Sequence, residues 1–171
     1  MTDSMDAILL GLVYPHPQAL GLLQASTRDL AAGEIRRQME DFVADISSLD
    51  LGEWEELHTR TLDLSPLFVP YVGHVVWGES YRRGAFMADL QRAQLDAGVD
   101  QQGELPDHLA PVLAYLAAVD QPLDDLVEVL PGAVTTMRRE LGKSDPGNPY
   151  RHVLAAAAAA IDAHLAKGAS A

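Results

Sequence analysis

Apolar residues recur along most of the chain at the three- and four-residue spacing that is typical of amphipathic α-helices. The clearest stripe lies between residues 34 and 48 and consists of Ile35, Met39, Phe42, Val43 and Ile46. Similar stripes predict helices over residues 3–13, 17–32, 51–62, 79–97, 106–118 and 150–166. No segment alternates with the period of a strand, and no Asn-Gly or Asp-Gly turn marks a hairpin. The pattern predicts an all-α protein with a single compact helical domain over residues 1–171, of which 168–171 form a frayed tail.

Proline and glycine positions predict where several of these helices begin and end. Residues 67–77 are apolar almost all round, which predicts a buried helix with Ser65 as its N-cap and Pro66 in its first position. Gly98 is predicted to be the glycine that commonly follows the last residues of a helix, here the helix over residues 79–97.

The segment after residue 118 is expected to contain two separate helices. Asp120 is predicted to cap the first of them, and the Pro131-Gly132 pair is predicted to end it, because proline disrupts a helix interior. The second helix is expected over residues 133–141, before a loop rich in glycine and proline.

The densest group of polar side chains lies at the expected start of the helix over residues 106–118. Pro106 is predicted in the first turn, where a missing N–H is tolerated. Glu104 and Asp107 would place carboxylates near the positive end of the helix dipole. This stretch is either a capped helix start in which His108 forms a local hydrogen bond, or a display of two carboxylates and an imidazole to a ligand.

Composition narrows the classes of partner. The chain has no cysteine, which excludes disulfides, thiolate metal sites and cysteine nucleophiles. Its formal charge of −13 disfavours nucleic acid and suits a basic or cationic amphipathic partner, although plain solubility explains the charge equally well. The N-terminal residues do not resemble a signal or transit peptide, and no apolar run approaches the roughly 20 residues of a membrane span. We therefore expect a cytoplasmic protein with no stable membrane insertion.

Histidine and aspartate side chains raise two further possibilities. His58, His74 and His108 could converge with Asp63 and Asp107 as a metal site, but their spacing places no two of them one helical turn apart. Asp107 and His108 would diverge by about 100° on a helix, which suits acid–base chemistry on one atom poorly. We therefore expect no enzymatic activity, no metal and no cofactor.

Four short pieces of sequence carry a resemblance to a known family, and a fifth, before the last helix, also resembles it. They are T-R-T-L-D at residues 59–63, H-x-x-x-G-E-S at 74–80, Arg83-Gly84 followed by Met87, E-L-P-D-H-L at 104–109, and N-P-Y at 148–150. In this order they resemble the NarJ-like branch (nitrate reductase delta subunit) of the TorD-type molybdoenzyme assembly chaperones. The chain departs from the family at Leu62, where an aromatic residue is usual, and at Trp77-Gly78, where His-Gly is usual. These departures leave the identity of the client enzyme open.

The resemblance implies a TorD/NarJ-like helical fold and a cytoplasmic chaperone that is not part of the finished enzyme. Its partner would be the apo catalytic subunit of a molybdoenzyme, with respiratory nitrate reductase, and thus nitrate assimilation, as the family's default. The chaperone would bind the N-terminal segment of that subunit, often a twin-arginine leader or its remnant, until the molybdenum cofactor is inserted. The machinery that delivers the cofactor would be a further partner, and a molybdoenzyme for another oxyanion or an organic substrate is an alternative client.

A peptide-binding surface is expected from these pieces. Acidic side chains would meet basic groups of the peptide, histidines would orient it, and the remaining residues would form an apolar wall. The expected set is Leu62, Asp63, Tyr71, His74, Glu104, Asp107 and His108. A small helical metal-binding protein or enzyme that uses the histidine–aspartate cluster, and a subunit permanently bound to its partner, are the rival hypotheses.

Overall fold

The computed structural model describes residues 3–170, and every regular element within this range is helical. The α-helices are α1 (Ser4–Leu12), α2 (Ala19–Asp29), α3 (Glu34–Ser47), α4 (Leu51–His58), α5 (Val72–Trp77), α6 (Tyr81–Asp96), α7 (Leu109–Ala118), α8 (Asp124–Ser144) and α9 (Tyr150–Ala169). A π-helical turn, η1 (Thr59–Asp63), continues directly from α4. The predicted all-α fold is confirmed.

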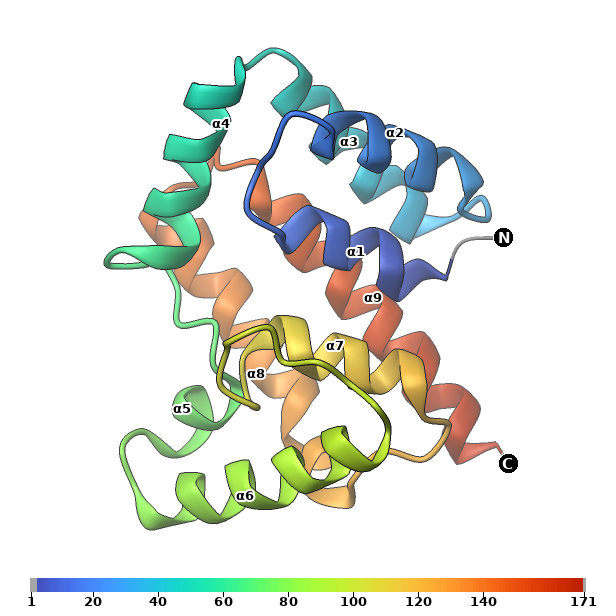
Figure 1. The fold of residues 1–171 in the computed structure, drawn as a ribbon, viewed down its shortest axis with the longest axis vertical. Coiled ribbons are helices and arrows are strands. Elements are labelled where there is room, and N and C mark those ends of the chain that lie inside the picture. Colours follow the sequence, from blue (N-terminus) through green and yellow to red (C-terminus); the bar gives the residue numbers. More distant parts are fainter. Residues whose placement is uncertain (1–2, 171) are drawn as a thin grey trace.

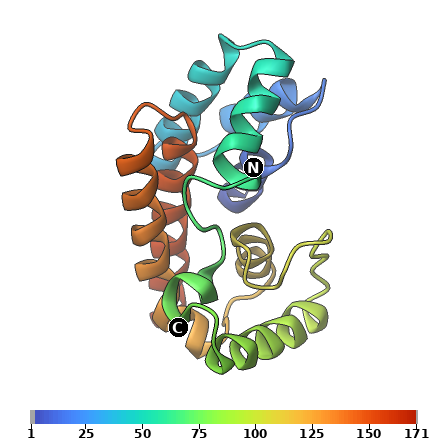
Figure 2. The ribbon, with the colours of Figure 1, turned by 90° about the vertical axis from the view of Figure 1, so that its left-hand side faces the viewer.

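The last helix, α9, organises the packing of the others. It packs against α1, α3, α7 and α8, and it lies behind α1 in Figure 1. Figure 2 shows α8 and α9 side by side along much of the long axis, with α1 to α4 towards one end and α5 to α7 towards the other. Alanines in the middle of α9 are buried, including Ala156, Ala157 and Ala160. The alanine run, which has little side chain to bury, therefore faces the core and lets the neighbouring helices approach closely.

The helices near the N-terminus follow the predicted pattern closely. Met39, Phe42 and Ile46 of α3 are buried, as their spacing predicts. At the start of α4, the Asp50 side chain accepts a hydrogen bond from the Glu53 N–H, and the Glu53 side chain accepts one from the Asp50 N–H. This reciprocal capping box fixes the first turn of α4.

The apolar segment 67–77 is helical only in its last part, which corrects the prediction of one helix over the whole segment. Ser65 does not cap a helix but takes a positive φ of 50°, and the backbone is irregular, with several bends, until α5 begins at Val72. The Val72 N–H donates to the Asp107 carbonyl at 2.8 Å, and the Leu109 N–H donates to the Pro70 carbonyl at 2.9 Å. These two bonds form an isolated antiparallel bridge, which satisfies backbone groups that a longer helix would have paired internally.

Helix α8 also differs from the prediction, because it is continuous through Pro131 and Gly132. It begins at Asp124 rather than after Asp120, with Leu123 in an extended conformation at the N-cap. Its buried residues keep one face on both sides of the proline: Leu126, Leu130, Ala133, Val134, Met137 and Leu141. Tertiary burial of this long stripe outweighs the hydrogen bond that Pro131 cannot donate.

Two helix ends complete the comparison. Gly98 follows α6 with a φ of 72°, the left-handed conformation that glycine adopts most easily, as predicted. Helix α9 continues to Ala169, beyond the expected end at residue 166, and Ser170 is its C-cap. Residues 168 and 169 are therefore helical and not part of a frayed tail. Ala171 lies outside the described residues.

Candidate functional site

The carboxylate of Asp107 lies at a buried junction of three segments. Arg83 of α6 donates from Nε to Asp107 Oδ2 at 3.0 Å and from Nη2 to Oδ1 at 3.3 Å. The Gly73 N–H, from the first turn of α5, donates to the same Oδ2 at 3.1 Å. Asp107 is 0% exposed and the Arg83 side chain 10%. A bidentate arginine and a backbone N–H together satisfy a charge that would otherwise be costly to bury.

This junction corrects two predictions. Asp107 does not lie in the first turn of a helix that displays it to solvent, because His108 is the N-cap and α7 begins only at Leu109. Arg83, the partner of Asp107, is buried as well. Both oxygens of Asp107 are already occupied, so this residue is not available to meet a basic group of a peptide.

Glycine at position 73 is required by the close approach of this carboxylate. A Cβ atom there would lie 2.7 Å from Asp107 Oδ2 and 3.1 Å from Arg83 Cγ. The absence of a side chain at Gly73 is therefore part of what allows α5, α6 and the segment before α7 to meet.

Tyr71, Glu104 and His108 form a partly exposed rim beside the junction. Tyr71 Oη lies 3.5 Å from Glu104 Oε2, and the rings of Tyr71 and His108 meet edge to face with centroids 5.3 Å apart. Arg83 also lies over the face of Tyr71, 5.7 Å from the ring centroid. The rim thus combines an aromatic face, an imidazole and an exposed carboxylate.

The imidazole of His108 is held in its neutral form by its surroundings. Its Nδ1 accepts a hydrogen bond from the Ala110 N–H at 3.1 Å and so cannot carry a proton while this cap is intact. Burial lowers the pKa of His108, and the nearby charges of Glu104 and Asp107 oppose that effect only in part. His108 therefore presents Nε2–H as a donor at the rim.

His74 belongs to the same region through Glu79. Its Nδ1 lies 3.4 Å from Glu79 Oε1, and the same oxygen lies 3.5 Å from Arg83 Nη1. Glu79 is largely exposed, with 85% of its side chain accessible. His74 is therefore linked to the buried junction by an exposed carboxylate, and not by direct contact.

Leu62 and Asp63 lie apart from this group, on η1. Leu62 packs partly buried against the core, whereas Asp63 is exposed. Within residues 3–170, no side-chain hydrogen bond or ion pair joins either residue to Tyr71, Glu104 or His108. The structure thus brings together five of the seven expected residues, namely Tyr71, His74, Glu104, Asp107 and His108, and leaves two on a neighbouring turn.

A second buried polar cluster connects η1 with the start of α9. Asn148 Nδ2 donates to Thr61 Oγ1 at 2.8 Å, and Asn148 Oδ1 accepts from the Tyr150 N–H at 2.9 Å. Trp54 Nε1 donates to Tyr150 Oη at 3.1 Å. Burial raises the pKa of Tyr150, which keeps its hydroxyl protonated. This cluster holds the π-turn against the C-terminal helix.

His58 lies between the second cluster and the surface. Its Nε2 is 3.1 Å from the Leu12 carbonyl, and its ring meets Tyr14 and Tyr150 edge to face at 5.2 Å and 5.8 Å. Its Nδ1 is buried without a partner among the described residues. Burial lowers the pKa of His58, because the charged form would lose its hydration.

Sequence reasoning missed the structural roles of Arg83, Gly73, Thr61 and Asn148. One signal for Arg83 was present: it precedes Phe86 by three residues and Leu90 by seven, which places it on the buried stripe of α6. Thr61 and Asn148 are 87 residues apart, so no local pattern connects them.

Two kinds of site are not found in the described part of the chain. Across residues 3–170 there is no group of three or more histidine, cysteine, aspartate or glutamate residues placed to hold a metal ion. Over the same range, no helix has both the length and the apolar character to cross a membrane.

Two comparisons of the sequence with known proteins found no match. No protein-family model matches the chain, and no curated protein matches its sequence. The resemblance to the NarJ-like chaperones therefore rests on the five short pieces of sequence alone and stays a prediction.

Proposed function

We propose that the protein is a cytoplasmic chaperone that binds the N-terminal segment of the apo catalytic subunit of a molybdoenzyme, with respiratory nitrate reductase as the first candidate. It would hold this subunit until the molybdenum cofactor is inserted. The observation that carries the proposal is the buried pair of Arg83 and Asp107. These residues come from two of the sequence pieces on which the resemblance rests, and they lie 24 positions apart.

Two further contacts support the proposal in the same way. The Thr61–Asn148 hydrogen bond joins the T-R-T-L-D and N-P-Y pieces. The Gly73 N–H that binds Asp107 immediately precedes His74, the first residue of a third piece. Residues of four pieces are therefore joined directly by buried side-chain bonds, and the remaining piece begins next to one of these bonds. This gives a physical reason for these residues to occur together in one fold.

The surface beside the buried pair suits an arginine-bearing, partly apolar peptide. Glu104 is exposed and offers a carboxylate, while Tyr71 and the 47% exposed Leu105 offer apolar contact area. An interaction between a guanidinium group and Glu104 would be charge-assisted and directional. The formal charge of −13 would steer a basic peptide towards the protein, and burial at the rim would supply affinity.

The client can be identified by a pull-down from native cytoplasm, followed by calorimetric titration with the N-terminal peptide of the retained catalytic subunit. We expect Glu104→Gln to weaken peptide binding about fivefold, because a charge-assisted contact at a partly exposed site is worth about 1 kcal/mol. Glu128→Gln, an exposed substitution on α8, is the matched control and should bind the peptide as wild type does.

The outcomes separate the function from the location of its site. Capture of no molybdoenzyme subunit would contradict the chaperone function. Equal peptide binding by wild type and Glu104→Gln would leave the function standing and move the site elsewhere. Co-purification with the mature, cofactor-loaded enzyme would instead favour a permanent subunit.

A further inference from the structure

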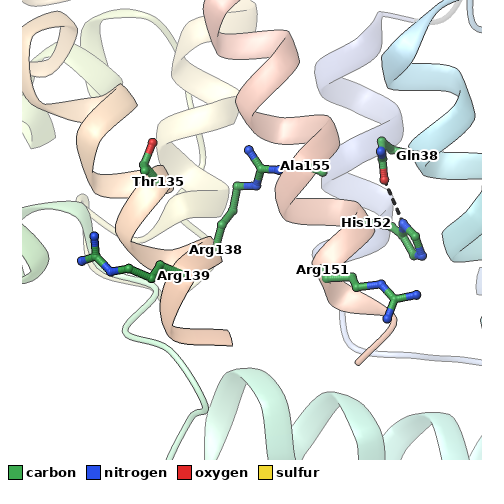
Figure 3. A pocket seen from close by; sticks show the side chains of 7 residues that line it. All are labelled: Gln38, Thr135, Arg138, Arg139, Arg151, His152 and Ala155. Carbon is green, nitrogen blue, oxygen red and sulfur yellow. Dashed lines mark hydrogen bonds between the residues drawn. The ribbon is translucent and has the colours of Figure 1, made fainter. Parts of the chain in front are cut away.

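Three arginines line a pocket between α3, α8 and α9, in a chain that carries 25 acidic and 12 basic residues. The pocket has a volume of about 480 Å³. Its lining residues are Gln38, Thr135, Arg138, Arg139, Arg151, His152 and Ala155 (Figure 3). No aspartate or glutamate is among them. The pocket is thus a locally cationic site on a protein whose overall charge repels anions.

The three arginines have different positions in the pocket. Figure 3 shows Arg138 extending from α8 across the space towards α9, while Arg139 and Arg151 lie at the two sides and point away from each other. Arg138 forms no hydrogen bond or ion pair with any described residue. The two outer side chains make only exposed contacts. Arg139 contacts Thr136 Oγ1 at 3.4 Å and Glu140 Oε1 at 3.7 Å, and Arg151 donates to a backbone carbonyl at 2.7 Å. They are therefore free to turn towards a bound anion at little cost.

Acidic neighbours offset this charge only in part. Asp45 Oδ2 lies 3.5 Å from His152 Nε2, and Glu140 Oε1 lies 3.7 Å from Arg139 Nε. Both contacts are longer than a good charge-assisted hydrogen bond. The carboxylate of Glu34 also lies within electrostatic reach of Arg138. None of these three acidic residues lines the pocket, so the guanidinium group of Arg138 remains the centre of a positive region that is only partly offset.

We propose that this pocket binds a small organic anion that carries two or more phosphate or carboxylate groups. Guanidinium groups match both kinds of oxyanion with paired N–H donors. The volume falls within the range of about 300–1,000 Å³ that small-molecule sites occupy. The arginines come from two helices. They therefore suit a ligand with two separated anionic groups better than a ligand with one phosphate or carboxylate group. His152, which contacts Gln38 at 2.8 Å, adds polar groups on the α3 side.

Calorimetric titration of the whole protein with pyrophosphate and, separately, with citrate tests this site at constant ionic strength. We expect saturable binding of at least one of them. Binding of pyrophosphate alone identifies a phosphorylated ligand, and binding of citrate alone identifies a polycarboxylate. Binding of both indicates that the pocket selects for charge. The absence of saturable binding by either anion overturns the proposal.

Matched variants locate the binding. Arg138→Gln and Arg151→Gln should each weaken the anion about tenfold, the effect of losing one charge-assisted contact of about 1.4 kcal/mol. Arg92→Gln, which changes an exposed arginine of α6 outside the pocket, should bind as wild type does. Wild-type binding by the Arg138 variant contradicts the assignment. None of the residues expected to bind the peptide lies on α3, α8 or α9, so this result is independent of the proposed chaperone function.

Discussion

Asp107 Oδ2 lies 3.0 Å from Arg83 Nε at a point where the carboxylate has no exposed surface. The pair connects α6 with the segment before α7, and the Gly73 N–H brings α5 to the same oxygen. A surface ion pair contributes little to stability, but removal of one partner from a buried pair leaves a charge that nothing compensates. The junction is therefore where the stability of α5, α6 and α7 is coupled.

Substitution of Asp107 by alanine should destabilise the protein by about 3–5 kcal/mol, because Arg83 would stay buried without its partner. Chemical denaturation measures this change in the free energy of unfolding. Asp96→Asn, at an exposed position of α6, should change it by no more than about 0.5 kcal/mol. An Asp107→Ala protein as stable as wild type would show that the buried pair is not the connection we describe.

Two glycine substitutions should act in opposite directions. Gly73→Ala should destabilise by about 1–3 kcal/mol, because its Cβ would lie 2.7 Å from Asp107 Oδ2. Gly84→Ala, on an exposed part of α6 with nothing within 4 Å of the new Cβ, should stabilise by about 0.5–1 kcal/mol. Thermal unfolding of both variants tests the two predictions. A stabilised Gly73→Ala protein would contradict the close approach of the Asp107 carboxylate to Gly73.

Acidification should destabilise the fold in part through His58 and His108. Burial lowers the pKa of both below the ordinary 6.5, so the unfolded chain binds protons first as the pH falls. The contribution of these two histidines to the free energy of unfolding is complete above about pH 6.5. It is lost as the pH falls towards the pKa values that they have in the folded protein. The melting temperature should therefore begin to drop as the pH falls through about 6.5.

The histidine contribution can be isolated at position 58. His58→Gln and His58→Phe differ in size and polarity, but both remove the titrating group. Each should flatten the dependence of melting temperature on pH, whatever its effect on stability at neutral pH. If both variants keep the wild-type slope, His58 does not contribute to it.

The proline inside α8 predicts an unusual gain of stability. Because proline has no N–H, Pro131 leaves the carbonyl one turn earlier in α8 without its helical hydrogen bond. The carbonyl of Pro131 itself does have a side-chain partner, since it accepts a hydrogen bond from Thr135 Oγ1 at 2.9 Å. Pro131→Ala should stabilise by about 1–3 kcal/mol, since the face of α8 is already set by its buried residues. Pro111→Ala in the first turn of α7, where no intrahelical bond is lost to proline, should bring no such gain. Denaturant midpoints would distinguish the two.

Local pattern predicted the parts of the fold that local interactions determine. The apolar spacing of α3 and the glycine after α6 are properties of a few consecutive residues, and both predictions are confirmed. The irregular segment before α5 was missed because the backbone at its end pairs with Asp107 and Leu109, far away in the sequence. Pro131 was expected to end a helix because proline disrupts a helix interior, but the buried apolar face of α8 continues across it.

The sequence predicted the clustering of most of the candidate residues better than the chemistry of each one. The polar stretch at Glu104 and His108 does lie beside Tyr71, as the peptide-binding hypothesis requires. The role of Asp107 was not accessible from its neighbours in sequence, because its partner Arg83 belongs to another helix. The charge of a carboxylate in the sequence does not show whether it is free to bind a ligand or already forms an ion pair within the protein.

Helix α9 has a consequence for how the protein is made. Its contact with α3 is the most extensive between any two helices in the described range, and Tyr150 at its start completes the polar cluster around Thr61. During synthesis, the parts of α1 and α3 that pack against α9 stay uncovered until α9 has left the ribosome. The nascent chain must therefore remain soluble while this apolar surface is exposed, and the acidic side chains on the outer face of α3 would help to keep it so.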